Sequence, residues 1–289
     1  MKILRSIQIP IFALLIAISL AFLFLPMLSV FFDMTPKEVY EQLQTPIALE
    51  SLKLSIYTTI ITLVIILLFG TPLAYFLATK NFPGKNILDV LIQLPIVIPP
   101  AVAGVGLIMV FGRFGWLGSH LDVYGIQIAF TAVAVIMSQV FISAPFYIMN
   151  ARTAFSGVDH NLVHVSRTLG GSRILTFFKV VMPLAFPGLI TGAALSWGRA
   201  LGEFGATIMF AGNFPGKTQV MPLAIFSAME SDIRIAVALS ALLILVAFFL
   251  LLSVKLVEYW PNIKRKYKKK RGNTKWSNVT SKSNYENLN

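Results

Sequence analysis

The sequence predicts an all-α integral membrane protein with six transmembrane helices. Of its 289 residues, 56% are hydrophobic and only 12% are charged, whereas soluble domains contain about 25% charged residues. The charged residues are confined to segments that separate six long uncharged runs. Each run is close to or longer than the roughly 20 residues that a helix needs to cross about 30 Å of hydrocarbon.

The uncharged runs are the candidate membrane helices, at residues 6–32, 54–79, 90–112, 123–151, 180–198 and 235–254. The first run is too long for the apolar core of a signal peptide and lacks a small-residue cleavage pattern, so we expect it to remain as a helix. Several runs contain proline, namely Pro95, Pro99, Pro100, Pro145, Pro183 and Pro187. Kinked helices are tolerated where they pack against protein or line a cavity, which favours a transporter over a simple anchor.

The distribution of Lys and Arg predicts the orientation in the membrane. Six spans place both termini on the same side as segments 80–89 and 152–179, and these same-side segments together contain 18 Lys and Arg residues. The segments on the other side, 33–53, 113–122 and 199–234, contain 6. Because Lys and Arg accumulate on the cytoplasmic side, both termini are predicted to be cytoplasmic.

The net charge of +12 comes mostly from the C-terminal segment 255–289, which holds ten basic and two acidic side chains. A basic segment that directly follows a membrane helix binds the anionic inner leaflet, and the Ser- and Asn-rich remainder has the composition of a disordered chain. We therefore interpret this segment as a tail that contacts the lipid bilayer and not nucleic acid. The absence of cysteine and the spacing of the three histidines predict no metal site.

The segment 212–218, GNFPGKT, is similar to a phosphate-binding loop but departs from it. Such a loop needs four residues between its two glycines, and only three separate Gly212 from Gly216. Pro215 also removes a backbone N–H from a loop that would hold phosphate through N–H groups. The predicted orientation places the segment outside the cell, so we expect neither ATP nor another cofactor to bind this chain directly.

Residues 159–170 predict a short amphipathic helix on the cytoplasmic side. Four positions share one face of this helix, namely Leu162, Val165, Ser166 and Leu169. Asp159 precedes the first turn, where its side chain can cap free N–H groups, and Gly170 and Gly171 follow the last turn. Periodicity alone leaves two partners open for the apolar face: the lipid interface or a neighbouring loop, and a groove on a soluble protein.

The segment 164–183, HVSRTLGGSRILTFFKVVMP, resembles the signature E-A-A-x-x-x-G-x9-I-x-L-P of the integral membrane subunits of bacterial ABC importers. Gly170 and Pro183 match the glycine and the proline of the signature at the right spacing. His164, Val165 and Ser166 stand where the family has Glu, Ala and Ala. The carboxylate of the signature is therefore absent, while the helix is retained.

This resemblance implies a type 1 ABC importer permease fold over residues 50–255, preceded by a helix and outer loop at 1–49 and followed by the tail at 256–289. In that family the helix after the fourth span docks into a cleft on a separate ATP-hydrolysing subunit. The resemblance implies a transport subunit of the cell (inner) membrane and not an enzyme, working as a homodimer with two ATP-binding subunits and an extracytoplasmic oxyanion-binding protein. The ATPase-coupling residues that it implies are Asp159, Leu162, His164, Val165, Arg167, Leu169, Gly170 and Pro183.

Two further stretches resemble the molybdate or tungstate type of these permeases. Residues 94–115, LPIVIPPAVAGVGLIMVFGRFG, are similar to its L-P-x-V-x-P-P-x-V-A-G stretch, and residues 198–226, GRALGEFGATIMFAGNFPGKTQVMPLAIF, are similar to its region after the fifth span. Sulfate or thiosulfate permeases share the L-G-E-F-G core but less of the MFAGN and PGKTQ stretches. The resemblance thus implies import of a tetrahedral oxyanion, first molybdate or tungstate, with sulfate or thiosulfate as the alternative.

Four residues near the end of the fifth run form a candidate pore or gate, namely Arg199, Gly202, Glu203 and Gly205. Arg199 and Glu203 are four residues apart, so they form either a helix-surface ion pair or a pair that faces the interior of the bundle. The glycines permit close packing or a bend. Because a glutamate repels an oxyanion, we expect Glu203 to act in gating or packing. A rival hypothesis, an ion-gradient transporter in which Glu203 carries protons, leaves the amphipathic helix unexplained.

Overall fold

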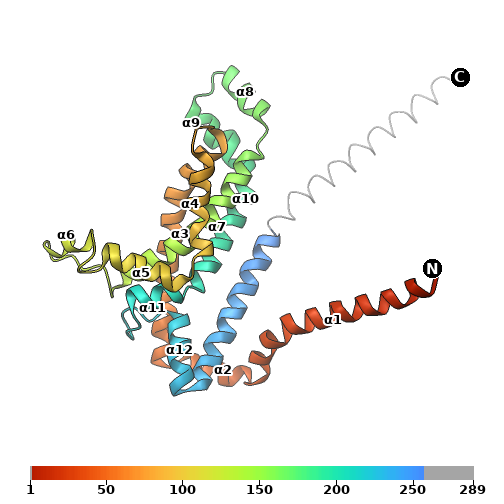
Figure 1. Cartoon of the computed structure of the whole chain (residues 1–289), viewed down its shortest axis with the longest axis vertical. Helices are drawn as coiled ribbons and strands as arrows, with labels where there is room; N and C mark the ends of the chain where they lie inside the picture. Colours follow the sequence, from red (N-terminus) through yellow and green to blue (C-terminus); the bar gives the residue numbers. More distant parts are fainter. Residues whose placement is uncertain (1, 257–289) are drawn as a thin grey trace, which may run out of the picture. The chain divides into compact units, whose positions relative to one another are not determined.

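The computed structural model describes residues 2–256, and this part of the chain consists of helices and connecting loops. The helices are α1 (Lys2–Phe32), α2 (Pro36–Leu43), α3 (Pro46–Thr79), α4 (Lys85–Val97), α5 (Pro100–Phe111), α6 (Gly118–Asp122), α7 (Ala132–Ser156), α8 (His160–Thr168), α9 (Arg173–Thr176), the π-helix η1 (Phe177–Val181), α10 (Met182–Leu201), α11 (Gly205–Ala211) and α12 (Met221–Ser231) (Figure 1). A further helix, Ile233–Leu256, follows α12. The basic tail predicted at 256–289 lies outside the described residues except for Leu256.

Five helices of the described part are long and apolar enough to cross a membrane, namely Phe12–Phe32, Pro46–Thr79, Ala132–Ser156, Arg173–Leu201 and Ile233–Leu256. Helices α4 and α5 meet the same criteria as a pair but are bent by 111° at the break between them. The described part therefore holds six spans when the bent pair is counted as one. This agrees with the predicted all-α membrane fold.

The break between α4 and α5 divides the uncharged run 90–112. Helix α4 ends at Val97, and Pro99 has φ −54° and ψ 131°, outside the helical region. A proline disfavours helical geometry in the residue before it and supplies no N–H donor. The two consecutive prolines therefore end one helix and begin the next, as Pro100 is the first residue of α5.

The fourth span begins later than the uncharged run 123–151 suggests, because residues 123–131 are not helical. Gly125 has φ 73° and Phe130 has φ 61°, both in the left-handed region. The amide of Phe130 donates instead to the carbonyl oxygen of Phe210 over 3.2 Å. A run of uncharged residues reports hydrophobicity alone, so it cannot separate an apolar loop from the helix after it.

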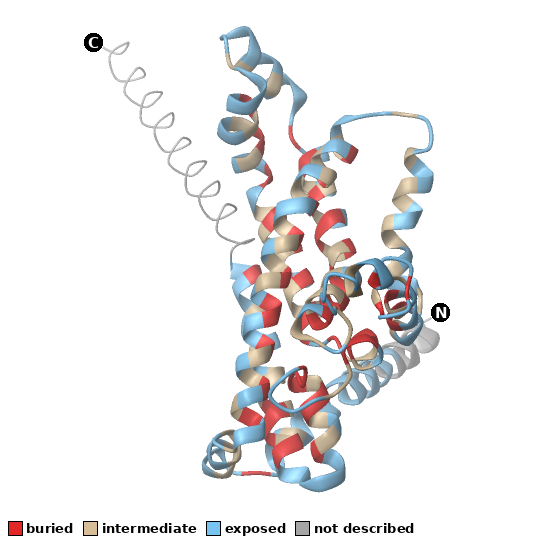
Figure 2. Cartoon of the chain, turned by 90° about the vertical axis from the view of Figure 1, so that its left-hand side faces the viewer, coloured by how far each residue is buried: buried red, intermediate tan, exposed pale blue. Residues whose placement is uncertain are grey.

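The chain forms two compact units that are each built from three stretches of sequence. The first unit contains residues up to 65, 90–143 and 197–248, and the second contains 66–89, 144–196 and the residues from 249 on. In the first unit, buried Leu107 of α5, Val135 of α7 and Phe210 of α11 pack in one cluster with Leu223 of α12. Figure 2 shows buried residues in red, alternating with intermediate and exposed residues along the helices.

In the second unit, α3, α7 and α10 are joined by a few specific contacts. The hydroxyls of Thr71 on α3 and Tyr147 on α7 lie 2.6 Å apart. A methyl group added to Gly188 of α10 would lie 2.6 Å from Cβ of Ala154 on α7, so these two helices approach at backbone distance. Helices α8 and α9 lie together beyond the ends of α7 and α10 (Figure 1).

Candidate functional site

Helix α8 has both end signals that the sequence predicted. The Asp159 carboxylate accepts a hydrogen bond from the amide of Asn161 over 2.9 Å, which satisfies one free N–H at the helix start. At the other end, Gly170 has φ 86°, a left-handed conformation that residues with a side chain rarely adopt. The helix therefore begins and ends through local interactions within 159–170.

Most of α8 is exposed, as the helix at the top of Figure 2 shows. The exposed fractions are 46% for Leu162, 53% for Val165 and 83% for Leu169. His164 and Arg167 are also exposed. Leu162, Val165 and Leu169 thus lie on one side of the helix and are about half or more exposed in the described part of the chain.

Ser166 does not belong to this exposed face, which corrects the sequence prediction. Its Oγ lies 3.0 Å from Oγ1 of Thr176 on α9, and its carbonyl oxygen accepts a hydrogen bond from the amide of Gly171 over 3.0 Å. Ser166 lies at the edge of the predicted face, and its side chain is directed toward Thr176 of α9. Within α8, Val163 and Ser166 are the half-buried residues that form its attached side.

Directly after Thr176, the residue of α9 that contacts α8, the chain enters an aromatic cluster. Phe177, the first residue of η1, has its ring centroid 4.8 Å from that of Tyr75 on α3 and 6.1 Å from that of Phe155 on α7. Tyr75 and Phe155 also contact each other, at 5.4 Å. The π-helix η1 ends at Val181, two residues before Pro183, which is the second residue of α10. A proline supplies no N–H and would clash with a carbonyl inside a regular helix.

Glu203 of the candidate gate is buried, with 1% of its side chain exposed. Its Oε2 lies 2.6 Å from Nη2 of Arg199, and its Oε1 accepts a hydrogen bond from the amide of Ala206 over 2.8 Å. The surface ion pair considered for these residues is therefore wrong, because the carboxylate faces the interior. The carboxylate joins the end of α10 to the first turn of α11.

The two glycines of the candidate gate differ in their surroundings. A methyl group added to Gly205 would lie 2.7 Å from Cβ of Pro100, so Gly205 permits the contact between α11 and the start of α5. A methyl group at Gly202 would meet its nearest neighbour, the carbonyl oxygen of Gly198, at 3.7 Å. Close packing thus requires glycine at 205, whereas Gly202 lies in the turn after α10 with room for a side chain.

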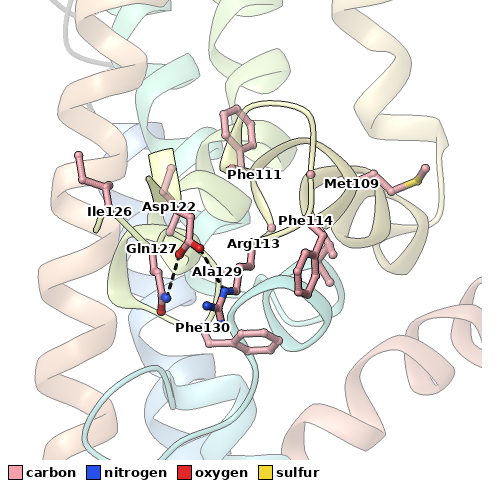
Figure 3. A pocket seen from close by; sticks show the side chains of 14 residues that line it. Met109, Phe111, Arg113, Phe114, Asp122, Ile126, Gln127, Ala129 and Phe130 are labelled. Carbon is pink, nitrogen blue, oxygen red and sulfur yellow. Dashed lines mark hydrogen bonds and ion pairs between the residues drawn. The ribbon is translucent and has the colours of Figure 1, made fainter. Parts of the chain in front are cut away.

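A pocket of about 450 Å³ lies between the end of α5 and the loop that contains α6. Figure 3 shows its polar side chains directed toward one another: Arg113 Nε lies 3.1 Å from Oδ2 of Asp122, and Gln127 Nε2 donates to Oδ1 of Asp122 over 3.0 Å. Both hydrogen bonds lower the pKa of the Asp122 carboxyl below its ordinary value, and the bond from Gln127 has the larger effect. The Arg113 charge is paired, and the remaining walls are mostly apolar.

The segment 212–218 folds on itself rather than around an anion. The amides of Lys217 and Thr218 both donate to the carbonyl oxygen of Phe214, over 3.1 and 2.9 Å. The amide of Phe214 donates to Oγ1 of Thr218, which is fully buried. These N–H groups are therefore used within the loop.

Sequence reasoning missed Thr176 and the ion pair between Arg152 of α7 and Asp89 of α4. Arg152 and Asp89 each border an uncharged run, but they are 63 residues apart in the chain. No local pattern indicates which charges at the ends of spans meet. Thr176 carries no periodic signal either, since α9 has only four residues.

Comparisons with known proteins agree with this architecture. A model of the family "Binding-protein-dependent transport system inner membrane component" matches residues 70–260. The chain is 37% identical over 254 residues to the probable transport system permease protein NifC of Clostridium pasteurianum, covering 88% of this chain and 89% of that protein. It is 37% identical over 239 residues to the molybdenum transport system permease protein ModB of Mycobacterium tuberculosis, covering 81% and 89%.

Among solved structures, a bacterial alginate ABC transporter in complex with an alginate pentasaccharide-bound periplasmic protein aligns with a TM-score of 0.65 over 88% of this chain and 92% of that one. The identity is 16%, so this likeness shows the fold alone. The family match and the two permease relatives show more. The chain belongs to the family of binding-protein-dependent transport system inner membrane components, the permease subunits of ABC importers.

Proposed function

We propose that this chain is the channel-forming permease subunit of an ATP-driven importer for molybdate or tungstate. The observation that carries the substrate is its 37% identity to the molybdenum permease ModB over 81% of the chain. The stretches 94–115 and 198–226, which resemble the molybdate type, support the same anion. Permease subunits carry out transport and not catalysis, so the chain is a transport subunit and ATP acts on a partner.

The proposed assembly contains two permease chains, two ATP-binding subunits and one extracytoplasmic oxyanion-binding protein. Members of the family work with ATP-binding subunits and a binding protein. The copy numbers rest on two-fold symmetry, because one chain with one α8 supplies half of a symmetric pathway. With both termini in the cytoplasm, α8 faces the ATP-binding subunits.

In this assembly α8 is the coupling helix. Leu162, Val165 and Leu169 are apolar and at least 46% exposed, and a groove on the ATP-binding subunit would cover them. Burial of one such side chain contributes about 1.5–3 kcal/mol. Asp159 and Gly170 hold the helix ends in place, and His164 replaces the glutamate of the family signature.

Copurification with the ATP-binding subunit tests the docking. The double variant Leu162→Asp with Val165→Asp should insert in the membrane but lose its partner, because two charges would enter an apolar groove. Gly170→Val should have the same effect through the strained left-handed backbone. Val123→Asp is the matched control, since Val123 is an apolar residue of the loop after α6 and is 82% exposed.

The same experiment can refute the docking. If the double aspartate variant still binds its partner and transports at the parental rate, α8 is not the coupling helix. His164→Glu, which introduces the residue of the family signature, should leave binding intact. Loss of binding in Val123→Asp as well would show that the assay reports general misfolding.

Uptake measurements test the substrate. Vesicles with the complete importer and its binding protein should accumulate labelled molybdate when ATP is present, and tungstate should compete. Competition by sulfate at equal concentration, with no selectivity for molybdate, would favour the sulfate or thiosulfate alternative.

We also propose that Arg199, Gly202, Glu203 and Gly205 belong to the gate of the pathway. Two features support this: the buried carboxylate joins α10 to α11, and Gly205 allows α11 to contact α5. The ion pair and the hydrogen bond of Glu203 hold the end of α10 and the start of α11 together, so these two helix ends would move as one body when the gate opens. Glu203 acts here in packing and not as an anion ligand.

A further inference from the structure

A coupling helix needs a stiff connection to the membrane helices, and the attached side of α8 is small. Only Val163 and Ser166 of α8 are half-buried, and the other residues of the helix are exposed. A helix held by so few contacts can tilt without moving its neighbours unless a directional contact ties it to them.

The hydroxyl pair of Ser166 and Thr176 is such a contact. The two oxygens lie 3.0 Å apart, and Thr176 is 3% exposed, so the hydrogen bond is shielded from water on the α9 side. The turn between the two residues is tight, because a methyl group added to Gly171 would lie 2.6 Å from the carbonyl oxygen of Ser166 and 3.2 Å from Oγ1 of Thr176. Ser166, Gly171 and Thr176 are thus closely packed at the junction of α8 and α9.

Phe177, the residue after Thr176, contacts two of the long helices of the second unit. Phe177 follows Thr176 directly, and its ring lies against Tyr75 of α3 and Phe155 of α7. The contact with Tyr75 is edge-on, whereas the ring of Phe155 is tilted against that of Phe177, and both geometries are favourable for aromatic pairs. The π-turn of η1 begins at this residue, and π-turns inside helices occur frequently at functional sites.

We propose that the Ser166–Thr176 hydrogen bond and Phe177 form a mechanical link that transmits the movement of α8 to α3 and α7. This link rests on the proposed docking of α8 on the ATP-binding subunit. Ser166, Thr176 and Phe177 are positioning residues: they contact neither ATP nor the transported anion. Without the link, the ATP-binding subunit still binds α8 and hydrolyses ATP. However, α8 then tilts without moving α3 and α7, so less anion is transported for each ATP hydrolysed.

The test compares transported anion with hydrolysed ATP in the complete importer, reconstituted in vesicles with its binding protein and molybdate. Thr176→Val keeps the shape and removes the hydroxyl, whereas Thr176→Ser keeps the hydroxyl. We expect Thr176→Val to lower the anion transported per ATP by about 2- to 10-fold, the factor that one hydrogen bond typically contributes to an equilibrium. Thr176→Ser should stay near the parental ratio.

Thr168→Val is the matched control for removal of a hydroxyl near α8. Thr168 is the last residue of α8, is exposed, and its hydroxyl donates to the carbonyl oxygen of Val165 within the same helix. It makes no connection to α9, so the ratio should not change. Copurification with the ATP-binding subunit is measured for each variant and should equal that of the parent.

The outcomes separate the link from the docking on which it rests. Equal ratios in Thr176→Val and the parent would overturn the link. An equal loss in Thr176→Val and Thr176→Ser would also overturn it, since the variant that keeps the hydroxyl would then lose as much as the variant that lacks it. If Thr176→Val does not assemble, Ser166→Ala removes the same hydrogen bond from its half-buried end, and a parental ratio there refutes the proposal. Failure of Leu162→Asp with Val165→Asp to weaken assembly would instead refute the docking.

Discussion

Gly104 allows α5 to contact the backbone of α11, and enlarging it should separate the two helices. A methyl group at Gly104 would lie 2.6 Å from Cβ of Met209, 2.8 Å from the carbonyl oxygen of Ala206 and 3.1 Å from its Cα. Backbone atoms cannot rotate away, so Gly104→Ala requires a shift of one helix against the other. Gly106 lies on the same helix, and a methyl group there has no neighbour within 4 Å.

The size of the effect depends on two opposing contributions. Overpacking in a well-packed core costs about 1–3 kcal/mol, and the backbone contact at Gly104 places it at the upper end. Alanine favours a helix over glycine by about 1 kcal/mol, which offsets part of the cost. Gly104→Ala should therefore destabilise the chain by about 2 kcal/mol, whereas Gly106→Ala should stabilise it by about 1 kcal/mol.

Thermal unfolding of the purified importer, recorded at one scan rate for all variants, measures this difference. At about 2–4 °C per kcal/mol for a chain of this size class, Gly104→Ala should lower Tm by about 4–8 °C and Gly106→Ala should raise it by a few degrees. A Tm for Gly104→Ala at or above that of Gly106→Ala would refute the close approach of α5 and α11.

Three further predictions concern orientation, the buried ion pair and the loop at 212–218. Because the chain has no cysteine, Lys85→Cys should react with an impermeant thiol reagent only from the cytoplasm and Lys217→Cys only from outside; the opposite pattern would invert the proposed orientation. Glu203→Gln keeps an acceptor for the amide of Ala206 but leaves Arg199 unpaired, so Tm should fall by an amount that corresponds to about 1–3 kcal/mol, and an unchanged Tm would contradict a stabilising role. Lys217→Ala should leave the ATPase activity of the importer unchanged, and saturable ATP binding by the permease alone that this substitution abolishes would contradict the folded-loop interpretation.

Helix α8 was predictable because its signals are local. Asp159 caps an amide two residues away, Gly170 supplies the left-handed residue that ends the helix, and the apolar positions recur at helical spacing. Each of these interactions lies within one or two turns, so the sequence specifies them whatever the rest of the chain does. The membrane spans were predictable for a related reason, since the length of an uncharged run is compared with a fixed bilayer thickness.

The pairing of helices was not predictable in this way. The sequence left Glu203 either on a helix surface or facing the interior, and only the approach of α11 to the end of α10 buried it and gave its second oxygen the amide of Ala206. Its spacing assigned Ser166 to the same helical face as Leu162 and Val165, and the position of Thr176 on a four-residue helix turned it inward.

The break between α4 and α5 at Pro99 illustrates both local and long-range determinants of structure. Two consecutive prolines determine that the helix breaks, because the backbone there lacks two N–H donors and the residue before a proline avoids the helical region. They do not determine the 111° between α4 and α5. That angle depends on what α5 packs against, and the contact of Gly104 and Pro100 with α11 involves residues about 100 positions apart in the chain, which no local preference encodes.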